Sequence, residues 1–399
     1  MKITGIKTAV IVGYGDWILL RIETDEGISG LGECFPALAR AARPTIETIR
    51  VAARVLADED PRDVNRLWTN LYEYFLGRPG SMGGLVTTVI SGIEIALLDI
   101  LGKSLGAPLY QLLGGRYRDR VRVYADCGQG EGLAPEGYAR KAREAVAKGF
   151  TALKFDVDGY SPVFTVQDWH PQSDDSPESA VQLRDSYARA LSASELHAIV
   201  ERVRAVREAV GETVDIAFDT GGYNVETAIR LARALEPFNL MWLEDPLPRE
   251  DPEQLARIKQ ACSTPILTGE CFYTRFGFKP LLDQGAVDLI SPDIQKMGGV
   301  LEARRVADMA SLKYIPIAPH CVCTPVGTAA SVHLCAVVPN FTVLEYHSIH
   351  LPYWEDLIVE PKRFLKDGFI DVPEGPGLGV ELNYEVAKRY ARADEGFFS

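Results

Sequence analysis

Eight short apolar runs, each ending on or next to a charged or ionisable residue, constrain the fold more than any other feature of this sequence. The runs are VRVYAD, TALKFD, VDIAFD, LMWLED, PILTGE, VDLISPD, YIPIAPH and FTVLEY. Amphipathic segments such as ELHAIVERVRAVREAV alternate with them, which is typical of repeated strand–helix units and a parallel sheet. The final ionisable residues of the last six runs lie 23 to 27 residues apart. This spacing predicts an α/β fold whose strands close into a barrel, with catalytic groups at the C-terminal ends of the strands.

The rest of the chain predicts a second structural unit, because 399 residues exceed the size at which one hydrophobic core keeps growing. Two alternating runs, ILLRIETDEG and ISGLGECF, predict a β-hairpin that turns at Asp25 to Gly27. Apolar residues at helix spacing follow from about residue 45 to residue 113. We therefore expect an N-terminal α+β capping domain at residues 1–118 and a barrel at residues 119–350. A C-terminal segment at residues 351–399 is expected to return to the N-terminal domain.

One interval between strand ends is longer than the others. Between Lys154 and Asp219 lies a polar stretch at residues 159–192 that is rich in turn-forming residues. Loops of this length are usually either functional or disordered. Several aromatic side chains favour order here, so we expect the insertion to form a lid or an oligomer contact. A disordered surface excursion is the alternative.

Composition and charge argue against several classes of function. The net charge of −13 and the pI near 5.1 are unsuited to nucleic acid, because phosphate binding needs clustered Lys and Arg. No apolar run reaches the roughly 18 residues of a membrane span, and the N-terminus lacks the features of a secretory signal. The seven cysteines are scattered without a CxxC pair, as in a reducing compartment. These features predict a cytoplasmic protein with neither nucleic-acid nor membrane partners.

Three carboxylates are predicted to meet at one rim of the barrel. Asp219, Glu244 and Glu270 end three consecutive strands, where bare like charges would repel one another. Hard oxygen donors with room for water and a substrate oxygen match octahedral Mg²⁺ better than zinc, which prefers His and Cys. A single strand-end carboxylate is more often a cap for the following helix. Three in register favour a Mg²⁺ site.

Further ionisable residues would line the same rim. His320 ends the strand after Asp293, so the two are predicted to form a proton acceptor with its orienting carboxylate, although a lone strand-end histidine would be structural. Lys154 would flank the barrel mouth opposite His320 and neutralise a substrate carboxylate, with Asp156 also facing the interior. Glu345 would complete the ring. If buried, it could stay protonated and donate a hydrogen bond to an enediolate.

The motifs together resemble the enolase superfamily, mandelate racemase subgroup, over nearly the full length. They are GLGE at Gly30 to Glu33, PLYQLLGG, LKFD, FDTGGYN, WLEDP, TGE, PDIQKMGG, APH, LEY and GPGLG. The resemblance implies a capping domain made from both termini over a (β/α)7β barrel. It also implies Mg²⁺ on the three strand-end carboxylates and a homo-oligomer. His320 with Asp293 would then act as base or acid, and Glu345 would lie beside the intermediate.

Two positions depart from patterns found in this subgroup. Many members have a second lysine two residues after the first, where this chain has Asp156, so a racemase with a lysine base opposite His320 is disfavoured. The KFD form is similar to acid-sugar dehydratases, although several of these carry a histidine where this chain has Gly221. The acid that protonates the leaving hydroxyl is therefore open between His320, Tyr223 and the insertion.

The sequence thus predicts Mg²⁺-dependent dehydration of an acid sugar, an aldonate or aldarate. The steps would be abstraction of the proton next to the carboxylate, an enediolate intermediate and loss of the β-hydroxyl. A racemase or epimerase of a hydroxy acid or amino acid derivative is the alternative, and a barrel that binds a carboxylate without turning it over is a third possibility. Expected substrate contacts are Tyr14, Trp17, Arg78, Tyr223 and His347.

Overall fold

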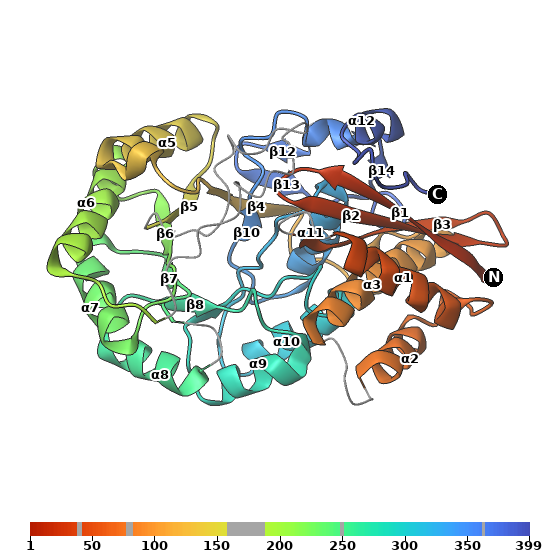
Figure 1. The fold of residues 1–399 in the computed structure, drawn as a ribbon, viewed down its shortest axis with the longest axis horizontal. Helices are drawn as coiled ribbons and strands as arrows, with labels where there is room; N and C mark the ends of the chain where they lie inside the picture. Colours follow the sequence, from red (N-terminus) through yellow and green to blue (C-terminus); the bar gives the residue numbers. More distant parts are fainter. Residues whose placement is uncertain (38–41, 77–82, 158–187, 248–250, 361–363) are drawn as a thin grey trace.

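The computed structural model contains a closed barrel beside an α+β unit (Figure 1). It describes residues 1–37, 42–76, 83–157, 188–247, 251–360 and 364–399. Strands β4 to β9 pair in parallel and in chain order; they are β4 (Arg120–Asp126), β5 (Ala152–Asp156), β6 (Asp215–Asp219), β7 (Trp242–Glu244), β8 (Ile266–Thr268) and β9 (Leu289–Ile290). Ile317 bridges β9 and Phe341, and β10 (Leu344–Tyr346) pairs with β4. This closure confirms the predicted (β/α)7β barrel.

Helices α5 to α11 connect the barrel strands and surround them (Figure 1). They are α5 (Pro135–Ala147), α6 (Ala193–Val210), α7 (Val225–Leu235), α8 (Pro252–Ala261), α9 (Thr274–Asp283), α10 (Val300–Ser311) and α11 (Pro325–Val337). Short 3-10 turns occur at Glu131–Leu133, Glu236–Phe238 and Glu355–Leu357. Local sequence starts several helices: Ser192 and Glu195 form a capping box at α6, and Asn224 caps α7. The barrel therefore follows from alternating strand and helix signals in the sequence.

A layer of side chains packs the barrel interior. Each residue of this layer comes from a different strand position around the barrel: Tyr124, Ala152, Ala217, Trp242, Leu267, Leu289, Ala318 and Val343. The rings of Tyr124 and Trp242 meet edge to face, with centroids 5.5 Å apart. Alanines at the neighbouring positions leave room for them. The interior is therefore a packed core and not a pore, as in other barrels of this kind.

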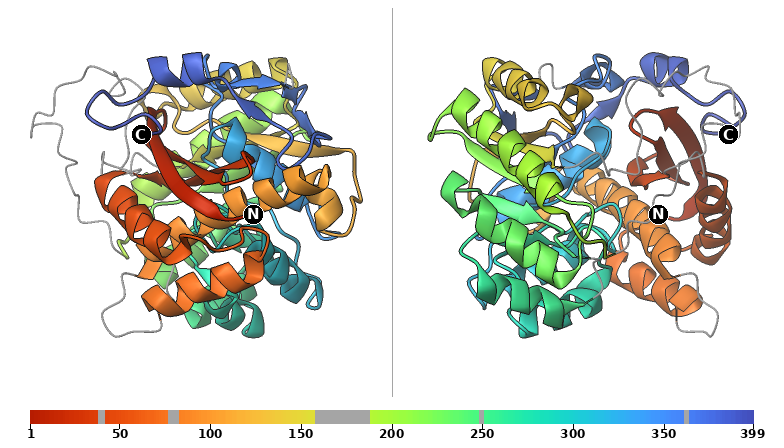
Figure 2. Two further views of the ribbon diagram at one scale, coloured as in Figure 1. Left: turned by 90° about the vertical axis from the view of Figure 1, so that its right-hand side faces the viewer. Right: turned by 60° about the vertical axis from the view of Figure 1, so that its left-hand side comes forward.

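The N-terminal unit is a three-stranded antiparallel sheet packed on helices. Its elements are β1 (Ile3–Val12), β2 (Asp16–Thr24), β3 (Ser29–Ala37), α1 (Ala42–Leu56), α2 (Val64–Leu76), α3 (Gly83–Leu105) and α4 (Leu109–Leu112). Gly27, at φ 79°, makes the predicted turn between β2 and β3. A Cβ at Gly32 would lie 2.0 Å from the carbonyl oxygen of Gly92, so glycine lets β3 approach the backbone of α3. Figure 2 shows this unit beside the barrel from two further directions.

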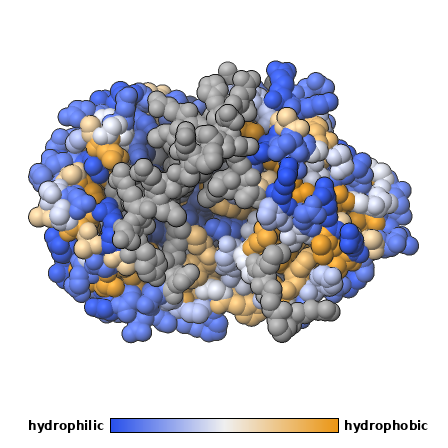
Figure 3. Space-filling model, in the orientation of Figure 1, coloured by the Kyte–Doolittle hydropathy of each residue, from blue (hydrophilic) through white to orange (hydrophobic). Residues whose placement is uncertain are grey.

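Helix α3 corrects one expectation from the sequence. It spans 23 residues and is apolar enough to cross a membrane, so an apolar segment of spanning length is present. However, 83% of its apolar window is buried within the protein, against β3 and neighbouring helices. It is therefore a core helix of the N-terminal unit. Hydrophilic residues cover much of the periphery of the face in Figure 3, outside the grey atoms.

The C-terminal segment returns to the beginning of the chain. It contains β11 (Ile358–Glu360), β12 (Leu365–Lys366), β13 (Phe369–Asp371), β14 (Glu381–Leu382) and α12 (Tyr384–Arg389). Strand β13 pairs with the start of β4, while the last residues run along β1. There the amide of Arg392 donates to Val10 and the amide of Phe398 donates to Thr8. Both ends of the chain thus belong to the same part of the molecule (Figure 1).

Two buried carboxylates of the N-terminal unit cap helices of the barrel. Glu94 on α3 accepts the amides of Val300 and Leu301 at the start of α10, both at 2.8 Å. Glu33 on β3 accepts the amides of Thr324 and Gly327 at the start of α11, at 2.8 and 2.9 Å. The first amides of a helix have no partner within the helix and favour a negative charge. These bonds therefore fix the N-terminal unit to the barrel through specific polar contacts.

His333 on α11 ties the barrel to the C-terminal segment. It is fully buried, and its Nε2–H donates to the carbonyl of Leu378 at 3.1 Å. Its Nδ1 has no hydrogen-bond partner among the described residues. Burial lowers the pKa of His333 to about 4, despite the bond to Leu378. The folded protein therefore resists protonation of this ring.

We predict that this histidine makes the protein less stable as the pH falls. Between about pH 6.5 and pH 4 the unfolded chain binds a proton at His333 that the folded chain does not, so acid favours unfolding. The loss between pH 7 and pH 5 should be about 2 kcal/mol. Urea unfolding at both pH values should show this loss reduced in His333→Gln and unchanged in His197→Gln, a substitution at an exposed site on α6. Equal losses in His333→Gln and the unsubstituted protein would contradict the prediction.

Candidate active site

The polar side chains at the C-terminal end of the barrel continue the inward-facing pattern of its strands. Successive inward positions on a strand are two residues apart. The interior layer described above, from Tyr124 to Val343, is called the packed layer. Two residues beyond its members are the residues that we call the polar layer: Asp126, Lys154, Asp219, Glu244, Gly269, Ser291, His320 and Glu345. The register pairs Asp126 with Lys154 and Asp219 with Glu244. The alternation that builds the core therefore also builds a polar layer next to it.

Lys154 on β5 is surrounded by carboxylates of this layer. Its Nζ lies 2.9 Å from Glu345 Oε1, 3.4 Å from Glu244 Oε2, 3.4 Å from Asp126 Oδ2 and 3.8 Å from Asp219 Oδ2. Burial opposes the charge of the lysine, but Glu244 and Glu345 outweigh it and hold the pKa of Lys154 well above its ordinary value. The site thus contains a fixed cation in an acidic protein.

Glu345 on β10 lies between Lys154 and His320. Its Oε1 faces Lys154, while its Oε2 is 3.4 Å from His320 Nε2 and accepts the amide of Cys321 at 2.8 Å. Burial works to raise the pKa of Glu345, but His320 and Lys154 bring it below its ordinary range. The expectation of a protonated Glu345 is therefore wrong. Two positive neighbours outweigh the cost of burying its charge.

His320 follows the strand position of Ile317 and points its two nitrogens at carboxylates. Its Nδ1 lies 2.6 Å from Asp293 Oδ2, and its Nε2 lies 3.1 Å from Glu270 Oε2. Burial opposes a charged imidazole, but Glu345, Glu270 and Asp293 outweigh it and hold the pKa of His320 well above its ordinary value. Asp293 fixes the ring, so the other nitrogen faces the interior of the site.

Asp219, Glu244 and Glu270 supply the oxygen atoms that the sequence assigned to a metal. In the described part of the chain, no three His, Cys, Asp or Glu side chains are placed so that they hold a metal ion as they stand. Lys154 contacts two of these carboxylates and His320 contacts the third. Even so, the donors fit a hard divalent cation. Glu244 Oε1 is buried with no hydrogen-bond partner among the described residues, and a cation would satisfy it.

Asp126 at the end of β4 belongs to this layer although the sequence analysis did not assign it. Its Oδ2 lies 3.6 Å from His347 Nε2 as well as 3.4 Å from Lys154 Nζ. Tyr14, from the loop between β1 and β2, packs its ring on His347 with centroids 3.7 Å apart. The sequence did carry a signal for Asp126. It follows Tyr124 by two residues, as an inward position must.

Two of the predicted substrate contacts pack in the hydrophobic core. Trp17 and Tyr223 are fully buried in the hydrophobic core. The indole N–H of Trp17 donates to the carbonyl of Val322 at 2.7 Å, and the ring of Tyr223 lies 5.2 Å from the guanidinium of Arg189. Their large apolar surfaces are removed from water, which favours packing over contact with a polar substrate. Lys154 and Glu345 are similarly buried, so burial alone does not exclude these two residues, and their contact with the substrate stays a prediction.

The remaining predicted positions lie at the edge of the site or beyond the described residues. Asp156 ends β5 and pairs in register with Asp219. Arg78 lies outside the described residues. Most of the 159–192 insertion also lies outside them, and its described end at residues 188–192 leads into the cap of α6.

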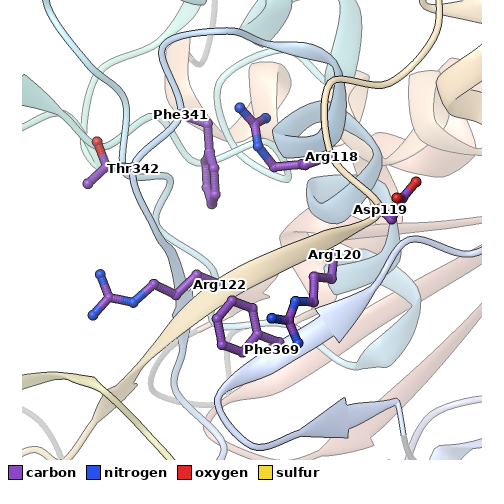
Figure 4. A pocket seen from close by; sticks show the side chains of 7 residues that line it. All are labelled: Arg118, Asp119, Arg120, Arg122, Phe341, Thr342 and Phe369. Atoms are coloured by element: carbon purple, nitrogen blue, oxygen red, sulfur yellow. The ribbon is translucent and has the colours of Figure 1, made fainter.

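A separate cavity lies at the opposite end of β4, far along the strand from Asp126. It has a volume of about 500 Å³. Its lining residues, shown in Figure 4, are Arg118, Asp119, Arg120, Arg122, Phe341, Thr342 and Phe369. The guanidinium of Arg120 stacks on Phe369 at 4.2 Å. None of the residues assigned to catalysis or metal binding lines this cavity.

Comparison with known families identifies the fold group. Residues 137–386 match the enolase C-terminal domain-like family, and residues 5–114 match the N-terminal domain of the mandelate racemase / muconate lactonizing enzyme family. The chain belongs to the enolase superfamily. The two matched regions correspond to the barrel with its C-terminal segment and to the N-terminal unit.

Individual proteins are similar over the whole length. The D-xylonate dehydratase of Haloferax volcanii is 40% identical over 403 residues, covering 100% of this chain and 90% of that protein. The D-gluconate dehydratase of Thermoproteus tenax is 34% identical and covers 94% of this chain and 69% of that protein. The crystal structure of a mandelate racemase/muconate lactonizing enzyme-like protein from Rubrobacter xylanophilus has 42% identity and a TM-score of 0.88. It covers 100% of this chain and 99% of that one.

We predict that Lys154→Met destabilises the protein in the absence of divalent cations, because Asp126, Glu244 and Glu345 would lose their buried counter-charge. Removing one partner of a buried ion pair costs about 3–5 kcal/mol. Urea unfolding with a chelator present should show a loss of this size. The matched control is Lys279→Met, which breaks an exposed pair and should cost less than about 1 kcal/mol. Equal stability of both variants would contradict the role of Lys154.

Proposed function

We propose that this protein dehydrates an acid sugar, an aldonate or aldarate, to a 2-keto-3-deoxy acid. The reaction removes the proton next to the carboxylate, passes through an enediolate and releases the β-hydroxyl as water. Membership of the enolase superfamily supports the chemistry. Two relatives, at 40% and 34% identity, are named D-xylonate dehydratase and D-gluconate dehydratase, which supports the substrate class.

One observation carries the proposal: a fixed cation and an oriented imidazole approach the two oxygens of one carboxylate. Lys154 Nζ and His320 Nε2 lie 2.9 and 3.4 Å from the oxygens of Glu345. A substrate carboxylate needs a cation, and its neighbouring carbon needs a base a few ångströms away. A site with both groups so close together is suited to abstracting a proton next to a carboxylate.

His320 is the base in this proposal. Asp293 accepts the Nδ1–H at 2.6 Å, so the ring cannot turn and Nε2 is the nitrogen that faces the site. The charges of Glu345 and Glu270 now hold the pKa of His320 high; with a bound divalent cation offsetting them, Nε2 would take the α-proton and Asp293 would stabilise the imidazolium. Because His320 is buried, little water competes for the proton at the moment of transfer.

Lys154 stabilises the charge that develops on the substrate. When the α-proton leaves, the carboxylate gains a second negative charge, and a fixed ammonium offsets it without having to move. Glu345, ionised between its two partners, keeps Lys154 and His320 in place. Asp156 remains a predicted member of the site, supported by its register with Asp219.

We propose Mg²⁺ as the cofactor, held by Asp219, Glu244 and Glu270. When bound, it supplies positive charge to substrate oxygens as they become more negative. The oxygen-only donor set supports a hard cation, as does the buried and unpaired Oε1 of Glu244 among the described residues. The cation would then balance these carboxylates, so that the charges of Lys154 and His320 would be available to the substrate without a change of position.

The alternatives have less support. A racemase needs a second base opposite His320, and Lys154 on that side is enclosed by four carboxylates that favour its charged form. The residue two positions on is Asp156 and not a second lysine. A barrel that only binds carboxylates has no need of an imidazole oriented by Asp293. One base and one fixed cation favour elimination.

The proposed dehydration also assigns substrate contacts, an oligomeric state and a compartment. Tyr14 and His347 contact the substrate, a small carboxylate, because they lie beside the polar layer. We also expect a homo-oligomer in the cytoplasm, which light scattering and cell fractionation would test.

We predict that the unsubstituted protein with Mg²⁺ forms a keto acid from at least one five- or six-carbon aldonate or aldarate, in a panel that includes D-xylonate and D-gluconate. His320→Asn should lower kcat roughly 10²- to 10⁴-fold, because general base catalysis contributes about that much. Semicarbazone formation measures the keto acid, and His197→Asn is the control. No keto acid from any panel member would contradict the proposal. Deuterium uptake at the α-carbon without dehydration would favour an epimerase.

A further inference from the structure

His347 and Asp126 form a second imidazole–carboxylate pair at the barrel mouth. Strand β10 pairs with β4 so that Tyr346 lies opposite Ala125. The next residues along the chain are His347, just after β10, and Asp126, the last residue of β4, and Nε2 of the histidine lies 3.6 Å from Oδ2 of the aspartate. The same aspartate oxygen is 3.4 Å from Lys154 Nζ. The pair is therefore connected to the groups that hold the substrate carboxylate.

The imidazole of His347 is held in a defined position. The ring of Tyr14 packs on it with centroids 3.7 Å apart. Its Nδ1 is buried and has no hydrogen-bond partner among the described residues, although 16% of the side chain stays exposed. A histidine held by a carboxylate at one nitrogen, with no partner at the other, is suited to exchanging a proton with a molecule that enters the site.

The position of His347 along its strand matches the shape of an acid sugar. Val343 belongs to the packed layer, Glu345 to the polar layer, and His347 occupies the next inward position toward the barrel mouth. His320, like Glu345, stands two residues beyond a packed-layer residue. If the substrate carboxylate lies against Lys154, its α-carbon lies near His320. The β-hydroxyl, one carbon further along, then extends toward the level of His347.

Loss of this hydroxyl requires a proton donor that the sequence left open. Hydroxide is a poor leaving group, so an acid must convert it to water as the carbon–oxygen bond breaks. Of the three candidates, His320 takes the α-proton in this proposal, the ring of Tyr223 packs in the hydrophobic core, and most of the 159–192 insertion lies outside the described residues. We propose that His347, positioned by Asp126, donates the proton that turns the departing β-hydroxyl into water. This inference rests on the proposed dehydration.

The steps balance without another reactant. Nε2 of His320 takes the α-proton, and the electron pair of the C–H bond enters the enediolate. This pair then forms a carbon–carbon double bond while the β C–O bond breaks, and the departing oxygen takes the proton of His347. The resulting enol becomes the keto acid by moving one proton from oxygen to the β-carbon. His347 regains a proton from solvent, and His320 returns its proton to solvent.

The test uses a leaving group that needs no proton. The substrates are the acid sugar that the unsubstituted protein dehydrates fastest and its 3-deoxy-3-fluoro analogue, both with Mg²⁺. His347→Gln keeps an amide that can reach Asp126 but cannot donate a proton as an imidazolium does. His350→Gln, at an exposed position three residues on, is the matched control. Keto acid, free fluoride and deuterium uptake at the α-carbon are measured for each protein.

We expect His347→Gln to lose water elimination roughly 10²- to 10⁴-fold while it keeps fluoride release within a few-fold of the unsubstituted protein. It should also introduce solvent deuterium at the α-carbon of recovered substrate, because His320 still works and the intermediate returns. Asp126→Asn, which affects a positioning residue, should show a smaller loss of water elimination at a similar KM, again with fluoride release kept.

Two outcomes would overturn the assignment of His347. One is water elimination by His347→Gln at the rate of the unsubstituted protein. The other is an equal loss of water elimination, fluoride release and deuterium uptake, which would mean that the residue only supports the site. If the unsubstituted protein eliminates neither water nor fluoride from any acid sugar, the proposed dehydration fails and this inference fails with it.

Discussion

The buried ammonium of Lys154 is the interaction on which the polar end of the barrel depends. Four carboxylate oxygens lie within 3.8 Å of its Nζ, and none of these groups could be buried together without a positive charge among them. The packed layer beneath makes the arrangement rigid, because its alanines and aromatics fix the strands that carry these side chains. A lysine therefore serves here as the counter-ion of a buried group of carboxylates, and the proposed contact with an anionic substrate would use the same charge.

The N-terminal unit reinforces the same site from outside the barrel. Glu94 caps α10, which follows the strand of Asp293, and Glu33 caps α11, which follows the strand of His320. The indole N–H of Trp17 also donates to the carbonyl of Val322, two residues after His320. Contacts between the N-terminal unit and the barrel thus fix the chain that follows Asp293 and the chain that follows His320. The position of the N-terminal unit on the barrel and the orientation of the His320–Asp293 pair therefore depend on the same contacts.

The strand positions and the carboxylates at or just after the strand ends could be predicted from sequence, because a buried parallel strand is a local apolar run whose end is marked by the first charged residue. Local patterns do not show which distant charges meet. The ionisation of Glu345 depends on Lys154 and His320, which lie at its two oxygens but are distant in the sequence. The burial of Trp17 is likewise decided by contacts hundreds of residues away. Asp126 could have been found by counting two residues from the packed layer.

The charge of the site argues further for a divalent cation. Its carboxylates are Asp126, Asp156, Asp219, Glu244, Glu270, Asp293 and Glu345, against the possible cations Lys154, Lys296, His320 and His347. These named carboxylates outnumber the cations even with both imidazoles protonated, and burial with neighbouring carboxylates raises the pKa of Asp219 above its ordinary value and that of Glu244 to about 7. An anionic sugar would be repelled from such a site. A divalent cation on the three oxygen donors would offset two of these negative charges and compete with His320 for Glu270, so that the imidazole would be available to a substrate.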